Sequence, residues 1–123
     1  MKPDQQELPI AHDFRGRRLP KGRSALVRLR REGSELCIEV VAPYFADPAP
    51  TAPVGPTDRL WEHEVVEVFI ADAAEHYVEV ELSPHGHHLV LELNGVRNAV
   101  RSQLPIAYSA RIEPASPGQL GRF

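Results

Sequence analysis

The sequence contains few of the residues and patterns that mark several protein classes. Its single cysteine, Cys37, excludes a disulfide within the chain and favours a reducing, cytoplasmic setting. No apolar run is long enough to cross a bilayer, and the opening MKPDQQELPI lacks the apolar centre of a signal peptide. The net charge of −3 gives no general attraction to nucleic acid. We therefore expect a cytoplasmic protein with neither membrane nor nucleic-acid partners.

Familiar catalytic motifs are missing as well. The sequence has no GxSxG nucleophile motif and no phosphate-binding glycine loop. Cys37 alternates within a strand-like segment, which favours a small packing residue over a reactive thiol. A basic run, RGRRLPKGR at residues 15–23, lacks the interleaved aromatic residues of a nucleic-acid patch. Residues 1–22 are therefore expected to form a polar, solvated N-terminal segment.

The remaining sequence is typical of an all-β protein. Its 12 prolines and 8 glycines favour many turns and disfavour long helices. Residues 43–59 are rich in proline and are predicted to form a long loop. Alternation of apolar and polar residues predicts strands at 24–31, 35–43, 64–70, 76–82, 87–93 and 105–113. We expect residues 23–123 to form one antiparallel β-sandwich domain of the jelly-roll or immunoglobulin-like type.

Pairing the central strands through their short connections predicts one apolar side and one polar side of a sheet. The connections ADAAE, SPHG and Asn94-Gly95 each read as a hairpin turn. The predicted core side holds Val66, Val68, Ile70, Val78, Val80, Leu82, Leu89, Leu91 and Leu93. The predicted polar side holds Glu67, Phe69, Tyr77, Glu79, Glu81, His88, Glu92 and Arg97.

The stretch LWEHEVVEVF, residues 60–69, places Glu67 in the middle of an otherwise apolar strand. The predicted pairing sets Glu67 opposite Glu79, with Glu81 diagonally near and Arg97 opposite Glu92. Like charges opposed across a ladder are destabilising unless solvent, a cation, a shared proton or ligand hydroxyl groups compensate them. The polar side is thus either an ordinary solvated surface or a binding site.

Three segments of this region carry a resemblance to known proteins: DRLWEHEVVEVFI, HYVEVELSPHGHHLVLELNGVRN and QLPIAYSARI. They closely resemble an uncharacterised family of small proteins that includes a human open-reading-frame product. The resemblance covers about residues 24–113. That family is distantly similar to the family-nine carbohydrate-binding modules of the DOMON-like superfamily, through a W-x5-E plus Y-x-E pattern.

The resemblance implies a β-sandwich that binds a sugar or another polyhydroxylated small molecule without catalysing a reaction. Trp61 would stack on the ligand, Glu67 and Glu79 would accept its hydroxyl donors, and Arg97 would neutralise or donate. The edge of the implied site would be lined by Tyr77, Glu81 and His88. A straight strand would hold Trp61 roughly 20 Å from Glu67, so we expect one helical turn between them, capped by Thr57 or Asp58.

Relatives of the family continue beyond the point at which GQLGRF ends this sequence. We therefore expect a C-terminally shortened sandwich that lacks the second aromatic of a sugar clamp. Its exposed strand edge would favour a homodimer.

Other functions remain open from the residues alone. The HGHH run could hold a metal through His85, His87 and His88, although alternation sends adjacent histidines to opposite sides. The carboxylates Glu67, Glu79 and Glu81 would suit Ca²⁺, and no other cofactor is expected. Glu67 and Glu79 could instead be the paired acids of a glycoside-acting enzyme. A protein-interaction or structural module with no small ligand is the remaining alternative.

Overall fold

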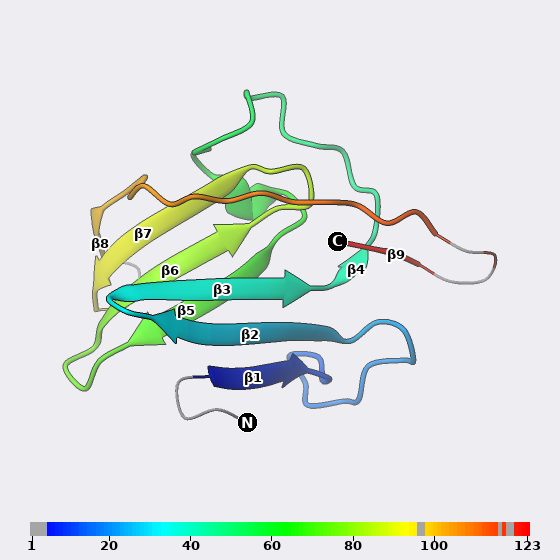
Figure 1. The fold of residues 1–123 in the computed structure, drawn as a ribbon, viewed down its shortest axis with the longest axis horizontal. Helices are drawn as coiled ribbons and strands as arrows, with labels where there is room; N and C mark the ends of the chain where they lie inside the picture. Colours follow the sequence, from blue (N-terminus) through cyan, green and yellow to red (C-terminus); the bar gives the residue numbers. More distant parts are fainter. Residues whose placement is uncertain (1–4, 96–97, 116, 118–119) are drawn as a thin grey trace. The chain divides into compact units, whose positions relative to one another are not determined.

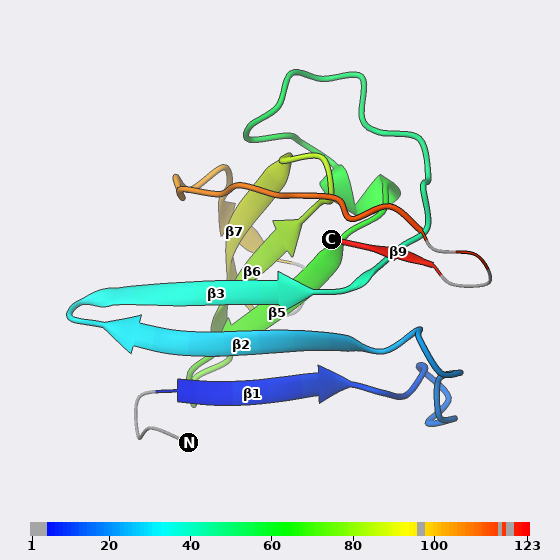
Figure 2. The ribbon, with the colours of Figure 1, turned by 45° about the vertical axis from the view of Figure 1, so that its right-hand side comes forward.

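The computed structural model describes residues 5–95, 98–115, 117 and 120–123, and the regular secondary structure of this part of the chain is almost entirely β (Figures 1 and 2). Its only helical element is a 3-10 turn, η1, at Leu60–Glu62. The strands are β1 (Gln5–Ile10), β2 (Ala25–Glu32), β3 (Glu35–Val41), β4 (Pro43–Tyr44), β5 (Val66–Ala71), β6 (His76–Leu82), β7 (His88–Asn94), β8 (Ala99–Arg101) and β9 (Gly121–Arg122). All pairs of these strands are antiparallel. The predicted all-β class with antiparallel sheets is confirmed, and it is consistent with a sandwich-like fold.

The chain divides into two compact units. The first comprises Met1–Phe45 with Ile112–Phe123, and the second comprises Ala46–Arg111. In the first unit, β1, β2 and β3 form one sheet in that order, and β4 pairs with β9. Strand β1 lies in the segment that was expected to be polar and solvated. Its QQELPI sequence pairs with residues 25–30 of β2, where an ion pair between Glu7 and Arg28 (3.1 Å) reinforces the ladder.

One predicted strand is not formed. Residues 105–113 contain no strand, and only Glu113 makes an isolated bridge, with Arg122. The left-handed backbone of Gln103 (φ 54°) follows the end of β8 and interrupts regular pairing. Two isolated hydrogen bonds hold this part of the chain instead. Just before the segment, the Leu104 amide donates to the Val90 carbonyl (3.1 Å), and within it the Tyr108 hydroxyl donates to the Ser83 carbonyl (2.6 Å).

The second unit contains the sheet that carries the predicted site, in the order β5-β6-β7-β8. Both central hairpins close with three-residue loops whose third residue has a positive φ, a common hairpin geometry. In the first loop this residue is Glu75 (φ 59°), and in the second it is Gly86 (φ 97°). Asp72 shapes the first loop, because its Oδ1 accepts the backbone N–H groups of Ala74 (2.9 Å) and His76 (3.1 Å).

These loops set a register that differs from the prediction. In the β5–β6 hairpin Glu67 pairs with Glu81, not Glu79, which is a shift of two residues and leaves each side chain on its predicted side. In the β6–β7 hairpin Val80 pairs with Val90, not Leu89. That shift of one residue turns every side chain of β7 to the opposite side of the sheet.

The predicted composition of the two sides is therefore wrong for β7. One side carries Glu67, Phe69, Tyr77, Glu79, Glu81, Leu89, Leu91 and Leu93, and we call it the glutamate side. The other side carries Val66, Val68, Ile70, His76, Val78, Val80, Leu82, His88, Val90 and Glu92. Both sides contribute to the core, since Val68, Val80 and Val90 are buried on one and Leu89 and Leu93 on the other.

The proline-rich region is a loop as predicted, except that Pro43–Tyr44 form β4, and it is hydrogen-bonded to the start of β7. The His88 amide donates to the Gly55 carbonyl (3.1 Å), and the Thr57 amide donates to the His88 carbonyl (2.9 Å). Nε2 of His87 lies 2.9 Å from the Ala52 carbonyl oxygen. No helical segment among the described residues has the length and hydropathy needed to span a membrane.

Candidate functional site

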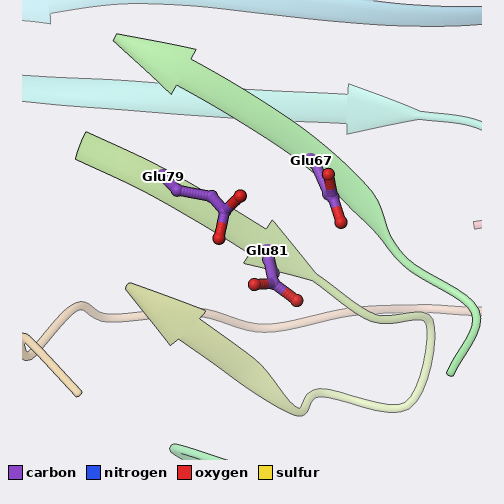
Figure 3. Close-up of side chains that lie close together, drawn as sticks. All are labelled: Glu67, Glu79 and Glu81. Atoms are coloured by element: carbon purple, nitrogen blue, oxygen red, sulfur yellow. The ribbon is translucent and has the colours of Figure 1, made fainter. Parts of the chain in front are cut away.

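Three carboxylates gather on the glutamate side of the second sheet (Figure 3). Glu67 comes from β5, while Glu79 and Glu81 come from β6. One oxygen from each side chain can be chosen such that all three lie within 4.8 Å of one another. Glu67 lies opposite Glu81 in the ladder, and Glu79 is its diagonal neighbour. The shared side predicted for Glu67 and Glu79 is thus confirmed, although their direct pairing is not.

The three carboxylates differ in their access to solvent. Glu67 is exposed, Glu79 is partly buried and Glu81 is fully buried, at 0% relative exposure. Both carboxylate oxygens of Glu81 lack a hydrogen-bond partner. Of the described residues, no arginine, lysine or histidine forms an ion pair with any of the three. The cluster is therefore open to solvent at Glu67 and electrostatically uncompensated at Glu81.

This environment raises the pKa of two of the acids. Burial raises the pKa of Glu81 to about 8, with further contributions from the adjacent Glu79 side chain and from the negative charges of Glu79 and Glu67. Burial also raises the pKa of Glu67 above its usual value, and the charge of Glu79 adds to this effect. At neutral pH an empty cluster therefore retains a proton, mostly on Glu81, which limits the repulsion between its members.

Two aromatic rings flank the carboxylates on the same side of the sheet. Phe69 lies opposite Glu79 in the ladder, and its ring centroid is 6.1 Å from that of Tyr77. The Phe69 side chain is exposed, at 54%, whereas Tyr77 is partly buried. An exposed phenyl ring beside a carboxylate provides a flat apolar surface and a hydrogen-bond acceptor within one small area.

Trp61 lies in η1, which confirms the helical turn expected between Trp61 and Glu67. The predicted cap is wrong, because the N-cap residue is Arg59 in a left-handed conformation (φ 58°) and no side chain caps the turn. Leu60 is fully buried and anchors the turn, while the indole of Trp61 is 49% exposed. This exposure leaves the ring available to a ligand.

One of the predicted site residues, His88, is not brought to this cluster. His88 pairs with Leu82, and so it lies on the side of the sheet opposite the glutamates, against the ring of Tyr108. His88 was misplaced because the true β6–β7 register differs from the predicted one by a single residue, which exchanges the two sides of β7. Arg97 lies outside the described residues. The partner of Glu92 in the ladder is Arg101, which forms an ion pair with it on the side opposite the cluster.

The histidines of the HGHH run do not form a metal site with the acids. His87 is buried and its Nε2 contacts the Ala52 carbonyl oxygen, while His88 points to the other side of the sheet. Within the described part of the chain, the glutamate cluster is the one group of three or more acidic, histidine or cysteine side chains with metal-binding spacing.

The sequence did not predict the leucine side chains of β7 that lie beside the cluster. Leu89 lies opposite Glu81, and Leu91 lies opposite Glu79. Leu89 is almost completely buried, which places the innermost carboxylate next to an aliphatic side chain. The available signal was the length of the SPHG connection, since a three-residue loop in place of a four-residue loop exchanges the two sides of β7.

Comparison with known proteins identifies relatives in vertebrates. The chain is 48% identical over 84 residues to the UPF0462 protein C4orf33 homolog of Danio rerio and 43% identical over 93 residues to the UPF0462 protein C4orf33 of Homo sapiens. These matches cover 66% and 72% of this chain but 43% and 46% of the relatives, so the chain spans about half the length of the curated relatives it matches.

No family model and no solved structure matches the chain, so the likeness to carbohydrate-binding modules stays a hypothesis. The resemblance to an uncharacterised family with a human member is confirmed. Over about two thirds of its length, this chain is a homologue of the UPF0462 C4orf33 proteins.

Proposed function

We propose that the second unit is a non-enzymatic module that binds a sugar or another polyhydroxylated small molecule on its glutamate side. The observation that carries this proposal is the shared location of an exposed ring, Phe69, and a carboxylate cluster that is open to solvent at Glu67. Ligand sites commonly combine an apolar surface with a few convergent polar groups.

The side chains have complementary tasks in this proposal. Glu67 and Glu79 accept hydrogen bonds from ligand hydroxyl groups, since a carboxylate offers two acceptor oxygens. The exposed faces of Phe69 and Trp61 offer stacking surfaces for the C–H face of a sugar ring. The role of Trp61 rests on the family resemblance and on its exposure. Glu81 is too deeply buried to contact a sugar directly, and it acts on the neighbouring carboxylates through its charge state.

A glycoside-acting enzyme is the second candidate, favoured by one observation. Glu67 and Glu81 lie directly opposite each other, a relationship that places Cβ atoms about 5 Å apart, and the pKa of Glu81 is raised to about 8. A protonated acid beside an ionised one is the arrangement of a retaining glycosidase. The full burial of Glu81 weighs against this candidate, because the acid must reach the glycosidic oxygen.

Tryptophan fluorescence tests the proposal directly, because Trp61 is the only indole of the chain. Titration with a panel of monosaccharides, disaccharides and linear polyols, in EDTA, should yield a saturable signal for at least one of them. Isothermal titration calorimetry then measures the affinity of that ligand for variants. Glu67→Gln and Phe69→Ala should each weaken binding at least about tenfold, the loss expected for a charged hydrogen bond or a stacked ring.

Glu75→Gln provides the matched control, since Glu75 is an exposed glutamate in a hairpin loop of the same sheet. It should bind the ligand as the wild type does. A panel without any response in either fluorescence or calorimetry would refute sugar or polyol binding. Turnover of a chromogenic glycoside that is lost in both Glu67→Gln and Glu81→Gln would favour the enzyme instead.

A further inference from the structure

We propose that Glu67, Glu79 and Glu81 form a binding site for a divalent cation and that Ca²⁺ is the ion they fit best. This inference does not depend on sugar binding. It rests on two separate observations: the convergence of three carboxylates, and the state of the innermost one.

The second observation concerns the buried end of the cluster. Glu81 has no exposed surface, and neither of its carboxylate oxygens has a hydrogen-bond partner. Buried polar groups are almost always satisfied, and burial of an unpaired carboxylate is costly. In Figure 3 its side chain extends to the same side of the sheet as those of Glu67 and Glu79. A cation between the three side chains would satisfy these oxygens and neutralise most of the accumulated charge.

The geometry of the cluster suits Ca²⁺. Its ligands are oxygens at 2.3–2.6 Å from the ion, so two of them on opposite sides are separated by about 5 Å. The chosen oxygens all lie within 4.8 Å of one another, which falls within that limit. Mg²⁺ requires shorter bonds of about 2.1 Å in a near-ideal octahedron, whereas Ca²⁺ accepts a flexible ligand geometry. Carboxylates from two different strands meet the looser requirement more readily.

The chemistry of the ligand set also selects a hard cation. The three side chains offer only carboxylate oxygens, and no histidine or cysteine belongs to the group. Such a set suits Ca²⁺ or Mg²⁺ better than Zn²⁺ or Cu²⁺, which prefer nitrogen and sulfur ligands. Because Ca²⁺ takes six to eight oxygens, three glutamates leave coordination positions free. The exposed position of Glu67 places these on the solvent side, where water or ligand hydroxyl groups can fill them.

Calorimetry and thermal unfolding of the whole chain, first stripped with EDTA and dialysed into chelator-free buffer, test the proposal without any sugar. Titration with CaCl₂ should give saturable binding near one ion per chain and a rise in Tm that grows with Ca²⁺ concentration. Glu81→Gln and Glu79→Gln should each reduce the affinity at least tenfold, while Glu75→Gln should leave it unchanged.

Glu81→Gln replaces a buried acid with an amide of similar shape, so the variant should still fold. Its Tm in the absence of calcium verifies this, and loss of folding therefore does not confound the test. Equal Ca²⁺ binding in wild type and Glu81→Gln, or no binding to the wild type, would overturn the proposal. Tighter binding of Mg²⁺ or Zn²⁺ would overturn the choice of calcium. If sugar binding fails in EDTA while Ca²⁺ binds, the proposed function falls and the cation site stands.

Discussion

Glu67 and Glu81 occupy directly opposed positions on β5 and β6, yet one carboxylate is exposed and the other is completely buried. A pair of like charges in such a position opposes the folding of the hairpin unless a proton or a cation intervenes. The pair therefore links the stability of the sheet to pH and to ion binding.

The stability of the chain should fall as the pH rises through the range in which Glu81 loses its proton. The pKa of Glu81 is raised from 4.5 to about 8 in the folded state, so between these values the folded state binds more protons than the unfolded state. The free energy of unfolding should then decrease by up to about 1.4 kcal/mol for each pH unit between these two values. Above pH 8 the decrease should end, because Glu81 is then deprotonated in both states. Urea unfolding at pH 5 and pH 8.5, in EDTA, measures the effect.

Glu81→Gln should remove most of this dependence, because the amide does not titrate. The difference in unfolding free energy between the variant and the wild type should therefore shift in favour of the variant as the pH rises from 5 to 8.5. Glu75→Gln should follow the wild-type curve. A variant with the same pH dependence as the wild type would show that Glu81 is not the responsible group.

Gly86→Ala should destabilise the β6–β7 hairpin. Gly86 has a φ of 97°, and a Cβ at this position would lie 2.9 Å from Cγ1 of Val54. We expect a loss of about 1–3 kcal/mol in the free energy of unfolding, from backbone strain and this contact together. Gly33→Ala is the control, since Gly33 has a φ of 60° and open space around it. Chemical denaturation should show a smaller loss for Gly33→Ala, and equal losses would exclude a contribution from Val54.

Glu75→Gly should stabilise the β5–β6 hairpin. Glu75 adopts a φ of 59°, a left-handed conformation that costs an L-residue roughly 1 kcal/mol. Glycine adopts this conformation without steric strain but loses more conformational freedom on folding. A net gain of about 0.5 kcal/mol in urea unfolding is therefore expected. Glu75→Ala, which retains the Cβ, should show no gain.

Substitutions at two neighbouring residues of β5 should affect stability and ligand binding separately. Val68 is 7% exposed on one side of the sheet, and Phe69 is 54% exposed on the other. Val68→Ala should cost about 1–3 kcal/mol of stability and leave the affinity of the folded protein for its ligand unchanged. Phe69→Ala should have a small effect on Tm and a large one on binding. If Phe69→Ala proves the more destabilising of the two, the ring has a structural role.

The positions of most strands could be predicted because alternation is a local property of the sequence. β2, β3, β5, β6 and β7 all form within a few residues of their predicted bounds. β1 was missed because Leu8 and Ile10 remain exposed on its short, proline-containing sequence, and so no buried pattern marks it. The predicted strand at 105–113 has the right alternation but no regular backbone partner, which a local pattern does not reveal.

The sequence predicts the candidate site correctly only where it also predicts the register of the hairpins. Glu67 and Glu79 share a side because the error in the β5–β6 register was an even number of residues. His88 was misplaced because the β6–β7 error was odd. The burial of Glu81 depends on packing at a distance in the sequence. Neither its charge nor its alternation distinguishes it from Glu79 two residues earlier.

The short loop Pro84–Gly86 also constrains how this protein can change over evolution or in the laboratory. One inserted or deleted residue would rotate Leu89 and Leu93 away from the acidic cluster and bring His88 towards it. A change of two residues would merely slide the strand along its neighbour. Homologous sequences that keep the glutamates should therefore vary the length of this connection in even steps.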